Sequence, residues 1–450
     1  MVVQHNMQAA NANRMLNVTT SAQSKSTEKL SSGYRINRAA DDAAGLTISE
    51  KMRKQIKGLD RASTNAEDGV SAVQTAEGAL TEVHSMLQRM NELATQSANG
   101  TNSNTDRQAI QDEIDQLTTE IDRVSETTKF NETYLLKGDG ADKAHNVNAH
   151  DAGLDGVTLT DKGDEVDVTL KTLNAGDKVS IAGKNYTIGA TDADAKKLYD
   201  GVATDGTATV TVNGKAYTVQ DTNPAADKNQ ISKADLDKLV KAGVTVEYNG
   251  KSMTVMDADA NGVDKKDSSV ITAATAYKLE TAEIVKASSI GTDTKAAAGT
   301  LTNNTFTLTK GKVNYNDALS FNLHVGADAD MTNKITVNID SMNSAGLGVK
   351  GIKADTEQDV TYAIDAIADA ISTVSSQRSA LGAVQNRLEH TINNLDNVVE
   401  NTTSAESRIR DTDMAEEMVN YSKNNILAQA GQSMLAQANQ SNQGVLSLLQ

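Results

Sequence analysis

The sequence predicts a mainly helical protein with an inserted α+β region. Both ends of the chain form a long coiled-coil helical bundle, and the inserted region is rich in β-hairpins. A heptad pattern of apolar residues runs through 360–402. The single proline, Pro224, lies mid-chain, so both ends lack the residue that most strongly breaks helices. All 12 arginines lie in 1–123 and 378–410, which sets the middle of the chain apart.

The composition excludes several classes of protein. The 450 residues include no cysteine and no tryptophan, and aromatic residues make up 3%. Without cysteine the chain cannot be a disulfide-stapled scaffold, a zinc ribbon or a thiol enzyme. With so few aromatic rings it lacks the stacking platforms that bind single-stranded nucleic acids.

The charge narrows the choice of partners. The net charge is −17, so phosphate backbones and anionic membrane surfaces would repel the chain. We therefore expect neither a nucleic-acid partner nor membrane insertion. No apolar run approaches the roughly 18 residues that a membrane span needs. The first 16 residues are polar, so we expect no cleavable secretory signal, and any export would use another route.

The two extreme ends carry weak apolar stripes. Residues 1–40 and 411–450 are rich in Asn, Gln, Ser and Ala, with apolar residues at helical spacing. Such helices are marginal alone, so we expect them to fold against copies of themselves, with helix formation coupled to binding. The residues expected to carry this polymerisation are Met7, Val18, Met414, Met418, Leu427, Met434, Leu435, Leu446 and Leu449.

The next segment on the N-terminal side predicts two helices. Apolar residues share one face from Val70 to Ala94, and Asn99-Gly100 breaks the pattern. A second apolar face then runs from Ile110 to Val124. With the C-terminal helix these segments can form an antiparallel bundle with left-handed packing.

The C-terminal helix has the strongest pattern in the chain. Its apolar positions alternate by four and three residues over six heptads, from Val360 to Thr402, which is typical of a coiled coil. Arg378 and Gln385 stand within this seam. We interpret them as residues that set the register rather than as catalytic groups.

The middle of the chain contains a repeated hairpin. Segments 179–188, 210–219 and 246–255 each predict a strand, a tight turn and a strand. Two of the turns are Asn-Gly, the pair that favours a type I′ hairpin. Short helices are expected at 192–200 and 232–242, so the region reads as one or two small α+β domains. A further hairpin, 319–325 with 334–342, is expected close to the helical body.

Candidate chemistry is sparse, and we expect no enzyme, no metal and no cofactor. His145 and His150 lie five residues apart in a polar loop, but zinc needs three or four convergent ligands. The segment 257–264 copies half of an EF-hand loop, yet Ser268 stands where the bidentate Glu belongs, so an Asx-rich turn is favoured. Catalytic triads, phosphate-binding loops and dinucleotide fingerprints are not found in the sequence.

Several motifs at both ends resemble those of bacterial flagellin. They occur in the family's order and cover about 1–138 and 345–450, together with the hairpin near 319–342. The matching segments are 30–46, 65–69, 87–97, 121–125, 381–388, 435–439 and 445–449.

The resemblance implies a structural subunit that polymerises into the flagellar filament for swimming. It implies export in an unfolded state by the flagellar type III apparatus, and an extracellular filament. The implied partners are other copies of the chain, an export chaperone, and the cap and hook-associated proteins. The implied domains are two halves of an inner-tube domain, 1–40 and 408–450, two parts of the helical bundle, 41–140 and 315–407, and a variable, surface-exposed outer domain, 141–314.

The resemblance also implies recognition by innate immune receptors. The footprint of Toll-like receptor 5 matches residues in the predicted helix that ends before Asn99-Gly100 and in the predicted helix that follows it. An alternative is that these residues form only a solvated helix face. Segment 28–49 similarly resembles the part of flagellin that a plant receptor kinase recognises. The residues matching the Toll-like receptor 5 footprint are Gln88, Arg89, Glu92, Leu93, Gln96 and Glu113.

Two other functions stay open at the level of the sequence. A hook–filament junction protein or another minor flagellar component has similar ends, and the abundance of the chain in purified filaments would separate these possibilities. The inserted region 140–318 could also carry an adhesin activity, which binding of that segment to a glycan or host protein would support.

Overall fold

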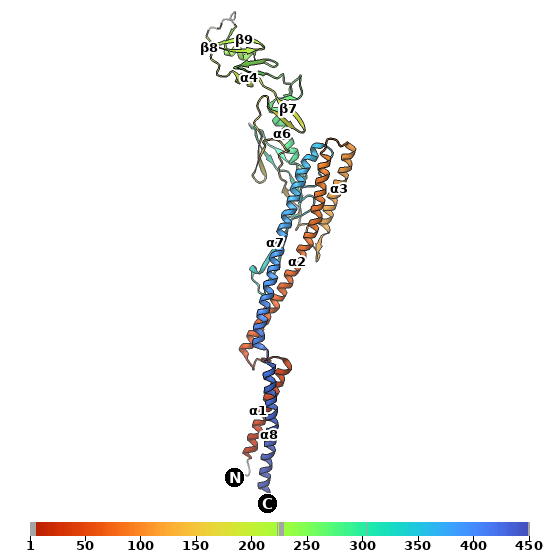
Figure 1. Ribbon diagram of the computed structural model, residues 1–450, viewed down its shortest axis with the longest axis vertical. Coiled ribbons are helices and arrows are strands. Elements are labelled where there is room, and N and C mark those ends of the chain that lie inside the picture. Colours follow the sequence, from red (N-terminus) through yellow and green to blue (C-terminus); the bar gives the residue numbers. More distant parts are fainter. Residues whose placement is uncertain (1–5, 223, 225–228, 303, 449–450) are drawn as a thin grey trace. The chain divides into compact units, whose positions relative to one another are not determined.

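The computed structural model describes residues 6–448 except 223, 225–228 and 303, with side chains described as far as Ser441. The chain forms two compact units, each assembled from segments far apart in the sequence (Figure 1). Unit 1 comprises 1–71, 322–337 and 383–450, and unit 2 comprises 72–321 and 338–382.

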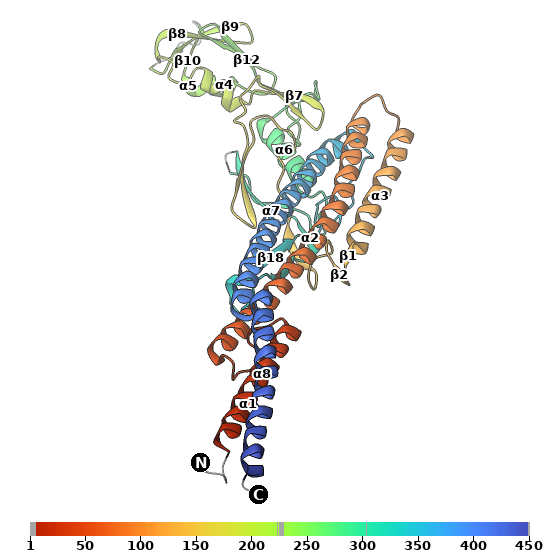
Figure 2. The same ribbon diagram turned by 60° about the horizontal axis from the view of Figure 1, so that its bottom comes forward.

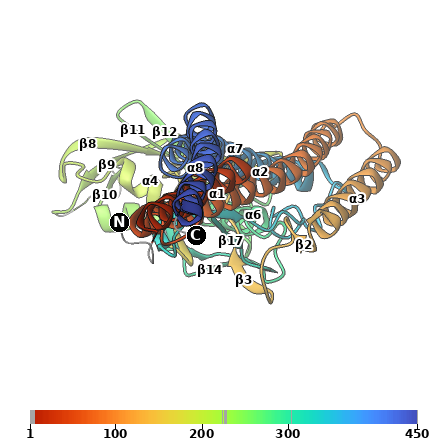
Figure 3. The same ribbon diagram turned by 90° about the horizontal axis from the view of Figure 1, so that it is seen from below.

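Unit 1 contains the two terminal helices, α1 (Met7–Ser32) and α8 (Met414–Leu448), which lie side by side and run antiparallel (Figures 1 and 3). Asn6 caps the start of α1 by accepting a hydrogen bond from the Ala9 N–H, and Gly33 ends the helix with a φ of 77°. The Asn6 amide also donates to the Ala438 carbonyl at 3.2 Å. The pairing buries little: Ser26 and Ala428 are its buried residues among those described.

Two long helices contribute to both units: α2 (Ala43–Ser97) and α7 (Glu357–Arg410). Within unit 1, α2 packs against a short β-hairpin. The Asn65 amide donates to the His324 carbonyl at 2.9 Å, and a Cβ on Gly69 would meet Leu323 at 2.2 Å. A Cβ at this position would force the Leu323 side chain to move, so Gly69 favours the close approach of the hairpin. This explains in physical terms why the flagellin-like segment 65–69 begins with Asn and ends with Gly.

The bundle in unit 2 is formed by α2, α3 (Asn104–Thr127) and α7 (Figure 2). The predicted heptad seam is confirmed, because its alternate positions from Val360 to Leu381 are almost completely buried. Arg378 in the seam pairs with Glu77 of α2 at 3.1 Å, which supports its interpretation as a register-setting residue. The predicted break near Asn99 is also confirmed, and Ser103 starts α3 with a capping box.

Short strands flank the bundle. The strands β1 and β2 form one hairpin, and the predicted hairpin near 319–342 is confirmed as β17 and β18, joined through a short 3-10 helix, η2. The strands β3 and β16, near the two ends of the inserted region, pair with each other. Their bounds are Lys129–Phe130 (β1), Thr133–Tyr134 (β2), Lys143–Asn146 (β3), Lys312–Tyr315 (β16), Leu319–His324 (β17), Met331–Asn333 (η2) and Lys334–Ile339 (β18).

The inserted region has two hydrophobic cores. The first lies among a four-stranded sheet, β14-β15-β5-β4, a three-stranded sheet, β13-β7-β6, and helix α6 (Ala273–Ala287). Neither α6 nor the four-stranded sheet is predicted by the local sequence pattern. The bounds are Thr158–Asp161 (β4), Glu165–Thr169 (β5), Lys178–Ile181 (β6), Lys184–Ile188 (β7), Val270–Ile271 (β13), Ala297–Ala298 (β14) and Thr305–Thr309 (β15).

The second core lies between a five-stranded sheet, β10-β9-β8-β11-β12, and the helices α4 and α5 (Figure 2). The expectation of one or two α+β domains is therefore confirmed as two cores. The bounds are Asp192–Leu198 (α4), Asp205–Val212 (β8), Lys215–Gln220 (β9), Gln230–Ile231 (β10), Lys233–Leu239 (α5), Thr245–Tyr248 (β11) and Lys251–Thr254 (β12).

The three repeated hairpins are confirmed, and all three turn through two residues with positive φ. Asn213 has a φ of 47° and Asn249 a φ of 54°, each followed by glycine, as a type I′ turn requires. In the first repeat Ala182 takes the same position with a φ of 54°. Alanine lacks the side-chain hydrogen bond that makes this conformation acceptable for asparagine, so this turn is the most strained of the three.

The polar segments considered as metal sites are used otherwise. Asp259 accepts hydrogen bonds from the Asn261 N–H at 2.8 Å and the Val263 N–H at 3.0 Å, so the Asx-turn interpretation is confirmed. His145 lies in β3 and stacks on Tyr315 with ring centroids 3.9 Å apart. Within the described part of the chain, no three side chains of His, Asp or Glu converge as metal ligands.

One buried carboxyl group interrupts the first core. Glu280 lies on the same face of α6 as Ala276 and Ile284, and the residue is only 6% exposed. Its Oε2 atom is buried with no hydrogen-bond partner. The strands packed against α6, β6 and β14, bring one charged residue, Lys178, which is exposed. Burial therefore raises the pKa of Glu280 from 4.5 to about 7.

This burial predicts that the first core loses stability as pH rises. The folded state prefers neutral Glu280, whereas the unfolded state ionises it from about pH 4.5, so stability is full below that pH and falls through pH 7. The loss is on the order of 3 kcal/mol. Glu280→Gln should remove this dependence. Urea midpoints between pH 5 and 8, followed by tyrosine fluorescence, test this, and a parallel decline in both proteins would contradict it.

Candidate assembly interface

The terminal helices of unit 1 leave large apolar side chains in solvent. On α1 these are the described residues Met7, Met15 and Val18, and α8 carries twice as many. Ile426 and Val419 are each 67% exposed, which is unusual for a β-branched aliphatic residue. The exposed set on α8 is Met414, Met418, Val419, Ile426, Leu427 and Met434. We call these nine side chains the terminal apolar set.

The spacing of the terminal apolar set places it on more than one face of α8. Val419 and Ile426 are seven residues apart and share one face, and Leu427 and Met434 share another. The two faces differ by about 80°, because successive residues turn by about 100°. Together they span about 100°, which is wider than the narrow seam that one partner helix covers in a coiled coil, and α1 also packs against α8. The helix α8 therefore offers surfaces for further helices.

The sequence predicted much of this set. Of the nine residues expected to carry polymerisation, six are exposed, and Leu435 is half-buried. Leu446 lies in α8 beyond the last described side chain, and Leu449 lies outside the described residues. Sequence reasoning missed Met15, Val419 and Ile426, although the seven-residue spacing of the last two could have shown them.

A compact set of contacts joins the terminal pair to the long helices within unit 1. The Arg35 N–H donates to the Arg410 carbonyl at 2.7 Å, and the Thr412 N–H donates to the Gly33 carbonyl at 3.0 Å. These bonds connect the end of α1 to the turn between α7 and α8. We call this region, residues 33–35 with 409–412, the terminal joint.

Arg410 is the central side chain of the terminal joint. Its guanidinium lies 4.6 Å from the centre of the Tyr34 ring and 3.1 Å from the Glu50 carboxylate. Glu406 lies at 4.0 Å and accepts a hydrogen bond from Ser49 at 2.7 Å. The side chain of Arg410 is 13% exposed, so these charges interact in a partly desolvated setting, where ion pairs are stronger than on the surface.

A second candidate surface lies on α2 and α3 in unit 2. Arg89 donates from Nε to Glu113 at 2.9 Å and from Nη1 to Glu92 at 3.2 Å. These hydrogen bonds, with Glu113 first, raise the pKa of Arg89. Gln88 and Gln96 are exposed on the same helix. The structure thus brings five of the six expected receptor-binding residues to the surface of two neighbouring helices, which we call the α2–α3 polar face.

Leu93 is the one member of the expected receptor-binding set that the structure buries. It is only 2% exposed, because it lies three residues after Met90 on the buried face of α2. It therefore supports the α2–α3 polar face from beneath and provides no exposed surface of its own in the folded chain.

The helices of the described residues are all too short or too polar to cross a membrane. Together, the antiparallel terminal helices, the heptad bundle and the inserted β-rich region form the arrangement that the flagellin-like motifs of the sequence imply.

Comparison of the sequence with known families gives a consistent result. Residues 3–141 match the bacterial flagellin N-terminal helical region and residues 364–449 match the C-terminal helical region. Flagellin of Clostridium tyrobutyricum is 42% identical, covering 98% of this chain and all of that protein. Flagellin of Bacillus subtilis (strain 168) is 36% identical, covering 100% of both chains. The chain belongs to the flagellin family, and its function is that of a structural subunit of the bacterial flagellar filament.

Solved structures resemble the chain much less closely. The match to FliC from Burkholderia pseudomallei covers 71% of this chain and 99% of the FliC chain, at 17% identity and with a TM-score of 0.27. The family assignment therefore rests on the sequence matches.

The terminal joint yields a test of Arg410. Arg410→Ala leaves Glu406 without its cation and leaves Glu50 paired only with Arg53, so it should weaken the joint by about 1–3 kcal/mol. The Arg35 and Thr412 amides should then exchange their hydrogens roughly 10- to 100-fold faster, as measured by hydrogen–deuterium exchange of the monomer. Arg408→Ala is the matched control, because Arg408 is exposed and bonds only to Ser404 of its own helix. Equal exchange in the two variants would contradict a role for Arg410.

Proposed function

We propose that the chain polymerises through the terminal apolar set. The observation that supports the proposal is the exposure of nine large apolar side chains on two helices that are already paired with each other. Soluble monomers rarely leave so many large apolar side chains on two paired helices in solvent unless another molecule covers them. Each side chain gains about 1.5–3 kcal/mol on full burial, so a few such contacts per neighbour suffice for assembly.

The contacts in this proposal join different faces of the same helix pair in successive copies. Such heterologous contacts give a closed ring only when the rotation between successive copies adds up to a full turn. Otherwise they give an open helical filament. Since α8 offers at least two faces, one copy can bind neighbours on more than one side. The terminal helices would also gain order on assembly, because little of their surface is buried in the monomer.

The remaining parts of the proposal follow the family. We assign 1–40 and 408–450 to the inner tube of the filament, 41–140 and 315–407 to the surrounding bundle, and 141–314 to its outer surface. The chain is exported to the cell exterior, with an export chaperone and the cap and hook-associated proteins as its partners. Its role is structural and involves no catalysis.

The polymerisation proposal predicts a strong effect at Ile426. Ile426→Asp places a carboxylate where a neighbouring copy would bury an aliphatic side chain, and an unpaired buried charge costs several kcal/mol. We expect no filaments by electron microscopy under conditions that polymerise the parent protein. Circular dichroism of the monomer should be unchanged, because Ile426 is 67% exposed there.

Ile426→Leu is the matched control at the same position, since it keeps the apolar character and nearly the same volume. It should form filaments. Filaments of normal length and number from Ile426→Asp would refute the proposed interface at this residue.

We further propose that the α2–α3 polar face is recognised by Toll-like receptor 5. The support is an exposed arginine, Arg89, held by Glu92 and Glu113 in a fixed position on two adjacent helices. Arginine is enriched among the residues that dominate binding energy at interfaces. Because its intramolecular ion pairs are exposed to solvent, they are weak, and Arg89 can exchange them for a receptor carboxylate at little cost.

Arg89→Ala should raise the concentration for half-maximal receptor activation by at least about tenfold, as expected for a hot-spot residue. A reporter cell line that expresses Toll-like receptor 5 measures this, with the monomer as ligand. Arg123→Ala is the control, because Arg123 is also exposed and pairs only with Glu120 of its own helix. If Arg89→Ala and Arg123→Ala activate equally, the face is merely solvated.

A further inference from the structure

Methionine is the commonest residue of the terminal apolar set. Five of the nine side chains are methionines, and these residues are 49–73% exposed: Met7, Met15, Met414, Met418 and Met434. A methionine side chain is flexible and apolar, so it packs against uneven surfaces at least as well as an aliphatic one. It differs from valine, leucine and isoleucine in one chemical respect, because its sulfur atom can be oxidised.

The methionines outside the terminal apolar set are mostly protected. Met90 and Met342 are completely buried, and Met256 is 8% exposed. Within the part of the chain that the structure describes, Met331 in η2 is the one highly exposed methionine that does not belong to the set. Since an oxidant must reach the sulfur atom, the terminal methionines and Met331 should react before the buried ones.

The oxidation of methionine by a peroxide is a simple oxygen transfer. The sulfur atom supplies two electrons, the O–O bond of the peroxide breaks, one oxygen atom joins the sulfur, and the peroxide leaves as water. The product is methionine sulfoxide, whose S–O bond is strongly polar. Reductases reverse the change with electrons from thiols, and the oxygen atom leaves as water.

The cost of a sulfoxide differs between the free subunit and the polymer. In the free subunit the terminal methionines are exposed, so water can solvate the new oxygen atom and the fold loses little. In the proposed interface a neighbouring copy covers these side chains. A polar oxygen buried there without a hydrogen-bond donor is strongly unfavourable. Oxidation should therefore weaken the contact between copies more than it weakens the subunit.

We propose that the five methionines of the terminal apolar set are sites of reversible oxidation by peroxides, and that their oxidation blocks polymerisation. The inference rests on the proposed function, because it requires that neighbouring copies cover these side chains. The redox state of the solution that surrounds free subunits then controls assembly. Subunits that have already assembled are protected, because their sulfur atoms are covered.

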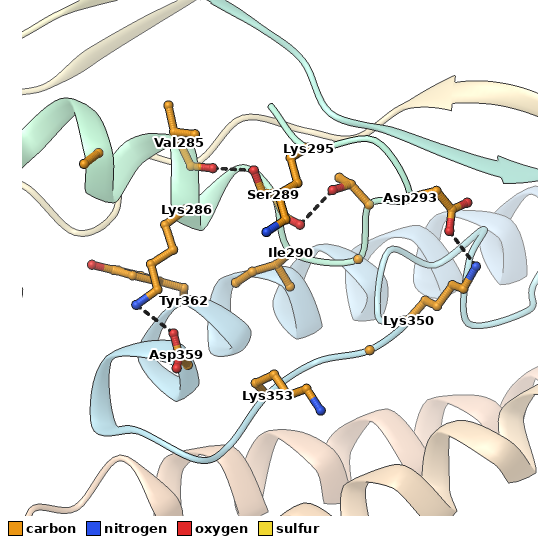
Figure 4. Close-up of a pocket in the computed structure, with 14 residues that line it drawn as sticks. Val285, Lys286, Ser289, Ile290, Asp293, Lys295, Lys350, Lys353, Asp359 and Tyr362 are labelled. Carbon is orange, nitrogen blue, oxygen red and sulfur yellow. Dashed lines mark hydrogen bonds and ion pairs between the residues drawn. The ribbon is translucent and has the colours of Figure 1, made fainter. Parts of the chain in front are cut away.

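The first core provides an internal control for the fold. No methionine belongs to this core among the described residues. Where the core meets α7, Lys286 pairs with Asp359 at 2.8 Å beside the ring of Tyr362 (Figure 4). The near-ultraviolet circular dichroism of buried tyrosines such as Tyr362 should therefore be unchanged when the terminal methionines of the monomer are oxidised.

Treatment of the full-length monomer with dilute hydrogen peroxide tests the proposal. Peptide mass mapping should show that the five terminal methionines react at least about tenfold faster than Met90 and Met342, because burial excludes the oxidant. The critical concentration for filaments, followed by electron microscopy, should rise at least about tenfold, as expected for buried polar oxygens. A pair of methionine sulfoxide reductases, one for each epimer, should restore filament formation.

Two variants separate the terminal methionines from other effects of peroxide. Replacement of all five by leucine keeps the apolar character and nearly the same volume, so this variant should form filaments both before and after treatment. Met331→Leu is the matched control, because it removes a similarly exposed thioether outside the set. It should form filaments before treatment and lose them afterwards, as the parent protein does.

The proposal is overturned if the oxidised parent protein forms filaments at its original critical concentration. It is also overturned if the reductases remove the sulfoxides without restoring filaments, or if peroxide abolishes filaments of the five-leucine variant. The Ile426→Asp variant, assayed without peroxide, tests the underlying interface separately. Loss of filaments in Ile426→Asp together with normal assembly of the oxidised parent would retain the interface and refute only its control by oxidation.

Discussion

The pairing of the first and last helices of the chain is the constraint on which unit 1 depends. Neither α1 nor α8 buries enough apolar surface to be stable alone, and even together they bury little. The terminal joint compensates by holding one end of the pair through backbone hydrogen bonds around Arg410. The same shortage of burial leaves apolar side chains exposed. If the monomer buried these apolar side chains fully, it would gain no free energy by covering them with neighbouring copies.

Sequence patterns predicted the parts of the fold that are local. The heptads of α7, the break near Asn99 and the three hairpins all depend on residues close together in the chain, and all are confirmed. The four-stranded sheet was missed because β5 pairs with β15, some 140 residues later, and no local pattern reports such a pairing. The helix α6 was missed because Glu280 occupies its buried face and interrupts the apolar period.

The candidate surfaces show the same limit. The spacing of apolar residues indicated which helices are amphipathic, but only the structure shows which faces are left uncovered, as for Val419 and Ile426. A motif match likewise named Leu93 together with Arg89, although burial separates them.

The pairing of β3 with β16 has a consequence for how the inserted region can change. Lys143–Asn146 and Lys312–Tyr315 are hydrogen-bonded neighbours, and the Val147 N–H extends the pairing to the Gly311 carbonyl. The chain therefore leaves and re-enters the bundle at adjacent points. Any module whose own two ends lie one strand apart could be spliced between them without moving the helices. These two strands are a ready-made attachment point, suited to the exchange of outer regions during evolution and to the display of foreign domains on a filament.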